Sequence, residues 1–451
     1  MNTTRANRRG RSNHINSSDY YRPVDDQKKE QHQNNSKNDS ILVSQRYHSP
    51  RERKMIFGFF SFVLAYIYIF NASIGNIGKE DIEKNALWSP DAVGTTPKEQ
   101  SKTNARQQQQ QLTKLRPIDY EQYTIRMNTW RRPKQLIQSV KHHASCPGVK
   151  EIQIVWCDKE NEPPTELLEM TERKSPGSSS DSRVVIERHE VNSLNERFNI
   201  LEPTPTLGIL SIDDDVLRPC EAIDSGFFKW VKSPHRMVGF DARTHVENDD
   251  GSWQYGYLST TKKENMYSLC LTRYCFLHRD YLNRYIYQLP STILDTVATK
   301  FNCEDIAMSL MISSLTQGRP PLLADVWAIQ SQLKLDVDDG ISASGTHKKF
   351  RDNCLNSFAS LFGLKDKDNE NQLQKAQWIH RTKSWFFNCG DTEDDNDNIP
   401  YIKSSREIEL ERKWEKLRLS EDKELLKKYL VKLAFETGED ARANGLLSMK
   451  N

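Results

Sequence analysis

Three consecutive carboxylates, Asp213, Asp214 and Asp215, follow an apolar run at residues 207–212. A run of that length and composition predicts a buried strand. Side chains alternate along a strand, so Asp213 and Asp215 point to one side. In an open α/β sheet, ligands bind at the carboxyl ends of the strands. The pair therefore suits a hard divalent cation shared with a diphosphate; the plain alternative is a solvated acidic turn.

The elements around this turn alternate between strands and helices. Strands are expected at residues 123–128, 151–156, 183–188, 207–212 and 236–240, with a helix from Pro133 and a short one at 192–200. This alternation predicts an α/β fold with a parallel sheet. After residue 241 we expect antiparallel strands, helices at 279–287 and from 304 to before Gly318, a last strand at 324–329 and a helix at 347–363. The sheet is therefore expected to be mixed.

The chain before residue 121 predicts a membrane anchor rather than a folded domain. Residues 1–54 are polar and basic and are expected to form a disordered cytosolic tail. No charge occurs among the 24 residues between Lys54 and Lys79, which predicts a transmembrane signal anchor at 55–77. The basic flank keeps the tail cytosolic and the rest luminal. A cleaved signal peptide and a buried core helix are the alternatives. Residues 78–120 are expected to be a flexible stem.

The remaining chain divides into a domain at 121–364 and a charged extension at 365–451 with a helix at 406–437. A net charge of +2 gives no reason to expect a nucleic-acid partner. All eight cysteines follow the anchor. They lack the Cys and His spacing of a zinc site, and in an oxidising lumen some can pair as disulfides.

Several blocks between Tyr123 and Gly363, in this order and spacing, resemble the exostosin-like glycosyltransferases of glycosyltransferase family 64. The blocks are TIRMNTWRRP, IQIVWCD, NSLNER, LSIDDD, MVGFDARTH, WQYGYL, YSLCLT, FLHRDYL, NCEDIAMSLMIS and FRDNCLNSFASLFG. The resemblance implies a GT-A-type, Rossmann-like domain that binds a UDP- or GDP-sugar with Mn²⁺ and transfers the sugar with retention. It also implies a glycan or glycolipid acceptor and a type II protein of the Golgi or endoplasmic reticulum.

The resemblance assigns site residues by position. Asp213 and Asp214 match substrate-binding positions, and Asp213 is expected near the donor's ribose. Asp215 matches the position of the metal ligand. Arg132, Asn192 and Arg197 match basic and nucleotide-contacting positions. Asp305 matches a candidate catalytic carboxylate and Arg351 an arginine near the leaving diphosphate. Cys303 and Cys354 match a disulfide pair. Without the resemblance, Asp305 is a helix-start acid, Arg351 a surface arginine and Asn192 a helix cap.

Two segments depart from the family pattern. Residues 272–275, Thr-Arg-Tyr-Cys, replace a common Thr-Gly-Ala-Ala, and Asp241-Ala242 replaces a proline motif. If the first segment lines the acceptor cleft, the acceptor or its pose differs. Because of these departures, an alternative hypothesis stays open: a catalytically inactive relative that binds a glycan or a partner enzyme. A calcium-binding structural module is disfavoured, because no loop of spaced oxygen ligands surrounds Asp215.

Overall fold

The computed structural model describes residues 121–172, 182–336, 347–366, 369–379, 403–419 and 423–447. The predicted tail, anchor and stem lie outside these ranges. Within them, no helix combines the length and apolar character needed to cross a bilayer. All described residues belong to one compact unit.

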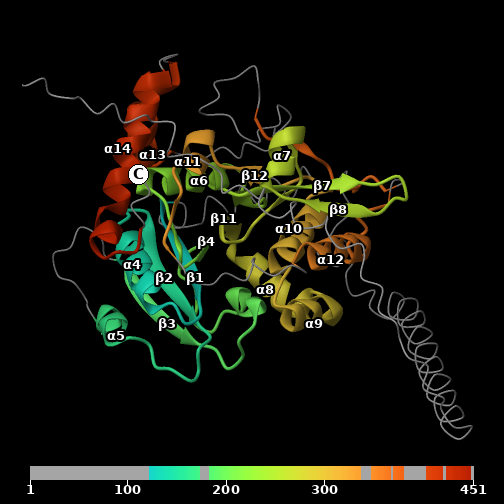
Figure 1. The fold of residues 1–451 in the computed structure, drawn as a ribbon, viewed down its shortest axis with the longest axis horizontal. Helices are drawn as coiled ribbons and strands as arrows, with labels where there is room; N and C mark the ends of the chain where they lie inside the picture. Colours follow the sequence, from blue (N-terminus) through green and yellow to red (C-terminus); the bar gives the residue numbers. More distant parts are fainter. Residues whose placement is uncertain are drawn as a thin grey trace, which may run out of the picture. The chain divides into compact units, whose positions relative to one another are not determined.

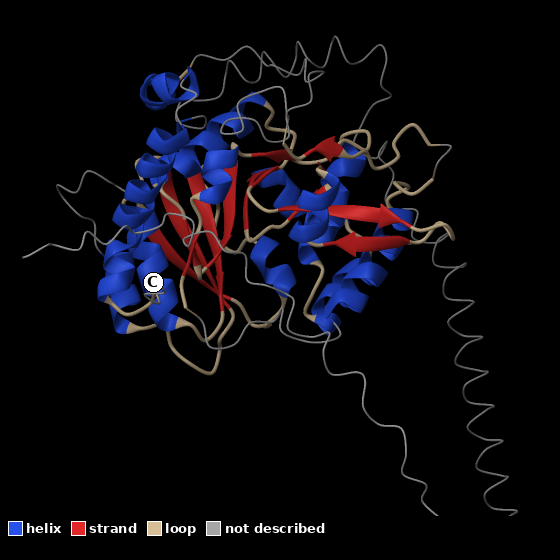
Figure 2. Ribbon diagram, turned by 45° about the horizontal axis from the view of Figure 1, so that its top comes forward, coloured by secondary structure: helices blue, strands red, loops and turns tan. Residues whose placement is uncertain are grey.

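A seven-stranded mixed sheet forms the centre of the fold (Figures 1 and 2). Its order is β12-β6-β11-β4-β1-β2-β3, and β11 is antiparallel to both of its neighbours. The other neighbouring pairs are parallel. The predicted mixed α/β class is therefore confirmed. The strands are β1 (Tyr123–Thr129), β2 (Val149–Trp156), β3 (Arg183–Arg188), β4 (Gly208–Asp213), β6 (Val238–Gly239), β11 (Tyr274–His278) and β12 (Leu322–Leu323).

Alternation along β4 and β11 supplies a core on each face of this sheet. Leu210 and Ile212 lie in one apolar cluster, whereas Ile209 lies in the other. The first cluster includes residues of α4 (Pro133–Ala144), α5 (Thr165–Glu172) and α6 (Cys220–Lys232). The second includes residues of the 3₁₀ helix η4 (Leu194–Phe198), α8 (Arg279–Gln288), α9 (Ser291–Lys300), α10 (Glu304–Leu315) and α12 (His347–Leu361).

Smaller sheets extend the fold beside the main one. A three-stranded sheet has the order β10-β7-β8, and two ribbons pair β13 with β5 and β14 with β9. Helix α7 (Leu258–Glu264) follows β8 along the chain. The strands are β5 (Val216–Leu217), β7 (Ala242–Glu247), β8 (Trp253–Gly256), β9 (Met266–Tyr267), β10 (Leu269–Cys270), β13 (Leu333–Lys334) and β14 (Ala376–Gln377).

The charged extension contributes two helices, α13 (Ser405–Leu419) and α14 (Lys423–Ala443), which lie beside α4 and α6 in Figure 1. Trp414 of α13 stacks on Trp327 with ring centroids 4.2 Å apart. Arg406 forms an ion pair with Asp224 of α6 at 2.8 Å. These helices therefore share a core with the main sheet.

Three sequence predictions differ from the structure. Residues 324–329, expected as a strand, contain the helix α11 (Val326–Gln330), and only Leu322–Leu323 before it pair with the sheet. A short apolar run fits either a strand or a buried helix, and here Trp327 packs against Trp414 from a helix. The single helix expected at 406–437 is two helices, and the helix expected at 192–200 is the shorter η4.

Candidate active site

The three aspartates lie where the connections of the main sheet change direction. From β1 the chain continues to β2 and β3 on one side, and β4 lies on the other side of β1. Such a switch point leaves a crevice at the carboxyl ends of the strands. Asn128, near the end of β1, is in register with Asp213 at the end of β4. The turn after β1 and the acidic turn after β4 therefore meet at one edge of the sheet.

The three carboxylates have different environments. Asp213 accepts a hydrogen bond from Nη2 of Arg197 at 2.5 Å. Asp214 is buried, accepts from Oγ1 of Thr129 at 2.7 Å and lies 3.3 Å from Nη1 of Arg132. Asp215 is 16% exposed, with an oxygen 3.6 Å from the same Nη1. Arg132 thus bridges two aspartates, and Asp215 has the least engaged carboxylate.

Burial sets the protonation of this acidic turn. It raises the pKa of Asp214 to about 7, while the hydrogen bond from Thr129 and the charge of Arg132 oppose that rise. Burial and then the neighbouring Asp213 also raise the pKa of Asp215. Concentrated negative charge is therefore unfavourable here until a cation joins it.

Arg197 is held in place by a buried polar network that the sequence analysis missed. Arg126 of β1 donates from Nε to the backbone oxygen of Arg197 at 3.1 Å. It also donates from Nη1 and Nη2 to the two carboxylate oxygens of Glu187 on β3, both at 3.0 Å. The available signals were Arg126 and Glu187, charged residues within the strands predicted at 123–128 and 183–188. Because it ties η4 to β1 and β3, this network aims Arg197 at Asp213.

Asn192 is not brought against the aspartates in the same way. It is exposed just before η4, and the neighbouring Ser193 caps that helix by accepting a hydrogen bond from the amide of Asn195. The simple helix-cap interpretation of Asn192 is therefore wrong. Its predicted contact with a nucleotide stays a prediction.

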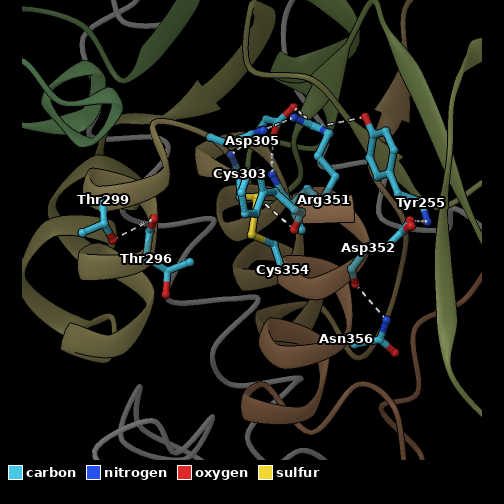
Figure 3. The surroundings of a disulfide bond; sticks show 12 residues. Tyr255, Thr296, Thr299, Cys303, Asp305, Arg351, Asp352, Cys354 and Asn356 are labelled. Carbon is cyan, nitrogen blue, oxygen red and sulfur yellow. Dashed lines mark hydrogen bonds and ion pairs between the residues drawn. A yellow bond between two sulfur atoms is a disulfide. The ribbon is translucent and has the colours of Figure 1, made fainter. Parts of the chain in front are cut away.

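Asp305 and Arg351, 46 residues apart, form a buried ion pair (Figure 3). Nη2 of Arg351 lies 2.5 Å from a carboxylate oxygen of Asp305 and donates to the hydroxyl of Tyr255 at 2.9 Å. Nη1 donates to the side-chain oxygen of Asn302 at 3.0 Å, and the guanidinium lies 4.3 Å from the ring centroid of Tyr255. Both residues thus lie in one cluster, and the arginine is already engaged by protein groups.

A disulfide joins the two elements that carry this pair. Cys303 immediately precedes α10, and Cys354 lies on α12 one turn after Arg351. These cysteines are the pair that the family resemblance implies. Their sequence separation of 51 residues corresponds to a stabilisation of about 4 kcal/mol on the loop-entropy model. A second disulfide, between Cys146 and Cys220, links the turn after α4 to the start of α6.

Side chains of α12 also complete the hydrogen bonding of β8. Asp352 accepts from the amide of Tyr255 at 2.7 Å. Asn356 accepts from the amide of Trp253 at 2.8 Å and donates to the carbonyl oxygen of Trp253 at 2.6 Å. Figure 3 shows Asp352 beside Tyr255 and Asn356 further along α12. Helix α12 is therefore fixed to the strand whose tyrosine contacts Arg351.

Glu304 couples this cluster electrostatically to the acidic turn. Burial and then the charge of Asp305 raise the pKa of Glu304 to about 7, while Arg197 and Arg351 oppose that rise. One carboxyl therefore interacts with the arginine that holds Asp213 and with the Asp305–Arg351 pair. Glu304 therefore lies within electrostatic reach of both predicted groups of residues.

The two departures from the family pattern form one salt bridge. Arg273 donates from Nε and Nη2 to the two carboxylate oxygens of Asp241, at 3.0 and 2.7 Å. The same carboxylate lies 3.9 Å from Nη2 of the buried Arg218. Burial opposes ionisation of Asp241, but Arg273 and Arg218 hold its pKa below the usual range. Tyr274 points into the core, where its hydroxyl hydrogen-bonds with Nε2 of His143 at 3.0 Å.

This shared carboxylate predicts unequal mutational effects. Asp241→Asn is expected to lower the free energy of unfolding by about 3–5 kcal/mol, because two guanidiniums lose their counter-charge. Arg273→Gln should cost less, since Asp241 still faces Arg218. Urea unfolding of both variants measures the difference. Equal losses of unfolding free energy in the two variants would show that Asp241 does not stabilise the charge of Arg218.

The described residues contain one compact group of three potential metal-ligating side chains, His142, Cys146 and Cys220. Its cysteines form a disulfide, and Nε2 of His142 lies 2.7 Å from the backbone oxygen of Arg218. The aspartates of the acidic turn do not converge into such a group. A cation at that turn would therefore need oxygen ligands from its substrate as well as from Asp215.

Fold and site together define a mixed α/β domain whose switch-point edge combines carboxylates with arginines. The chain belongs to glycosyl transferase family 64, whose domain matches residues 123–378. This family membership confirms the resemblance seen in the sequence.

Its relatives include glycosylinositol phosphorylceramide mannosyl transferase 1 of Arabidopsis thaliana, 34% identical over 248 residues that cover 53% of this chain and 72% of the relative. Mouse exostosin-2 is 28% identical over 251 residues, covering 55% of this chain but 33% of its own length. A solved structure, the mannosyltransferase PcManGT from Pyrobaculum calidifontis in complex with GDP-Man and Mn²⁺, shares 10% identity over 53% of this chain and 65% of that one. The TM-score of this structural match is 0.30.

Proposed function

We propose that this chain is a membrane-anchored, Mn²⁺-dependent, retaining glycosyltransferase with a GT-A-type domain. It would transfer a sugar from a UDP- or GDP-sugar to a glycan or glycolipid acceptor. The observation that carries the proposal is the meeting of the Asp213–Asp215 turn with Arg132 and Arg197 at the switch point. Family membership supplies the reaction class.

The residues present fit a hard cation. Asp215 offers a partly exposed carboxylate, while Asp213 is engaged by Arg197 and Asp214 by Thr129. One protein carboxylate with diphosphate oxygens and water is a usual ligand set for such ions. When bound, Mn²⁺ would neutralise negative charge on the leaving diphosphate. Arg132, beside Asp215, would bind the same diphosphate, and Asn192, Arg197 and Asp213 would orient the nucleoside.

The Asp305–Arg351 pair would act at the sugar. In a retaining transfer without a covalent intermediate, the acceptor hydroxyl attacks from the face that the diphosphate leaves, and positive charge develops on the sugar ring. A carboxylate at Asp305 would stabilise that charge. Arg351 fixes the orientation of this carboxylate by donating a hydrogen bond to it from Nη2. The guanidinium would also attract the departing diphosphate.

The salt bridge between Arg273 and Asp241 bears on the alternative of an inactive relative. Each residue departs from the family pattern, yet each supplies the partner of the other. The paired substitutions are therefore compatible with an intact fold and do not by themselves argue for lost catalysis. Asp213, Asp215, Asp305 and Arg351 are all retained.

The test is donor hydrolysis by the full-length chain purified in detergent. UDP-N-acetylhexosamines and GDP-mannose come first, because relatives include exostosins and a mannosyl transferase. We expect one sugar nucleotide to be hydrolysed with Mn²⁺ and to survive after the metal is chelated. Nucleotide binding without turnover of any donor, in the presence of glycan and glycolipid acceptors, would favour the inactive relative. The anomeric configuration of the transfer product tests retention.

The proposed anchor at residues 55–77 would place the catalytic domain in the lumen of the Golgi or endoplasmic reticulum. Protease added to sealed microsomes should trim only the tail before Met55, because the membrane shields the luminal part of the chain. Detergent-permeabilised microsomes serve as the control, in which the whole chain becomes accessible. Digestion of the domain after Tyr123 in sealed microsomes would contradict this topology.

A further inference from the structure

A segment outside the family domain packs against the ribbon that follows the acidic turn. That domain ends at residue 378, whereas α14 begins at Lys423. A separate small apolar cluster contains Leu217 of β5, Leu335 just after β13, Ala441 of α14 and Leu446 beyond it. All four side chains are buried. We call residues 441–447 the C-terminal brace.

Backbone hydrogen bonds connect the brace to Asp215. The amide of Asp336 donates to the carbonyl oxygen of Leu446 at 2.8 Å. The preceding amide, of Leu335, donates to the carbonyl oxygen of Asp215 at 2.8 Å. Two adjacent amides of one segment therefore hold the brace on one side and the acidic turn on the other. Asn444 adds a hydrogen bond to Gln138 of α4 at 2.9 Å.

The ribbon between them is too short to be stable without this packing. Strands β5 and β13 pair through two residues each, and an isolated two-stranded ribbon is at best marginally stable in water. Leu217 of β5 and Leu335, just after β13, pack in the cluster that the brace completes, whereas Val216 of β5 packs in the large cluster of the main sheet. Asp215 directly precedes β5, so loss of the ribbon would release its backbone oxygen from the Leu335 amide and allow its carboxylate to shift.

We propose that the C-terminal brace positions Asp215 for binding of the metal–diphosphate group, which makes the extension part of the donor site. This inference rests on the proposed function. Leu446 is a positioning residue, because it acts through β13 and touches no substrate.

The test compares two leucine truncations in the full-length chain in detergent. Leu446→Ala removes a brace side chain, and Leu430→Ala removes a buried leucine of α14 that packs in the large cluster of the main sheet. Both should lower the melting temperature. Calorimetry with Mn²⁺ and UDP, and with Mn²⁺ and GDP, measures nucleotide affinity. Hydrogen exchange measures protection of the Leu335 amide.

Leu446→Ala should weaken binding of the nucleotide that the wild-type protein binds by about tenfold, a loss of about 1.4 kcal/mol of binding free energy. It should also speed hydrogen exchange at the Leu335 amide. Leu430→Ala should leave the nucleotide affinity and the exchange rate at Leu335 unchanged. Leu446→Met, which keeps a large apolar side chain, should have wild-type values of both. Equal affinities in Leu446→Ala and wild type would overturn the inference and leave the proposed function standing. Failure of wild-type protein to bind either nucleotide would refute the proposed function and this inference with it. If Leu446→Ala does not fold, Leu446→Val provides the same comparison with a smaller deletion.

Discussion

Asp215→Asn is expected to abolish Mn²⁺-dependent nucleotide binding and to leave the fold intact. The change removes the ligand charge from the least engaged carboxylate of the acidic turn, whose nearest cationic atom is 3.6 Å away. The neighbouring carboxylates cannot take over, because Arg197 holds Asp213 and Thr129 holds Asp214. Calorimetric titration with Mn²⁺ and the nucleoside diphosphate gives the affinity, and circular dichroism checks the fold.

Asp295→Asn is the matched control for this prediction. Asp295 is exposed on α9, so the same chemical change should leave nucleotide affinity unaltered. If Asp215→Asn binds the nucleotide as tightly as wild type, Asp215 does not hold the metal.

Asp305→Asn is expected to lower turnover by about a hundredfold or more, with little change in donor affinity. Loss of an interaction made only in the transition state has this signature. The variant should also lose about 3–5 kcal/mol of unfolding free energy, because Arg351 keeps its charge in a buried site without its carboxylate. Initial rates, donor titrations and urea unfolding measure the three quantities.

A second buried ion pair separates catalysis from stability. Asp224→Asn removes the carboxylate that pairs with Arg406 at 2.8 Å on the side of the extension helices. It should destabilise the chain while folded protein keeps its turnover. Tyr255→Phe tests the cluster itself, since it removes one hydroxyl partner of Arg351 and leaves the ion pair. Wild-type turnover in Asp305→Asn would show that Asp305 has a structural role only.

The sequence predicted those features that depend on local patterns. The apolar run before Asp213 identified β4, and alternation around the first strands identified the parallel part of the sheet. Residues 324–329 were misassigned because a six-residue apolar run has no distinctive period. The resemblance supplied Asp305 and Arg351 as separate candidates.

Contacts between distant residues could not be predicted in this way. Nothing near Asp305 indicates that Arg351 is its partner, and Arg273 and Asp241 looked like two independent departures. The support of Asp215 by Leu335 and Leu446 depends on how a C-terminal helix packs. Such pairings depend on the complete topology, in which hydrophobic burial decides which strand ends and helix ends meet.

The bonding of α12 to β8 has a consequence for self-association. β8 is the outer strand of its three-stranded sheet, and an open edge can recruit a strand from another molecule. Asp352 and Asn356 occupy the amides of Tyr255 and Trp253 that such a strand would use. The disulfide through Cys354 holds this helix in place, so oxidation should close the edge. Under reducing conditions the newly synthesised chain should therefore aggregate through β8. Aggregation, rather than thermodynamic stability, would then limit the yield of folded protein.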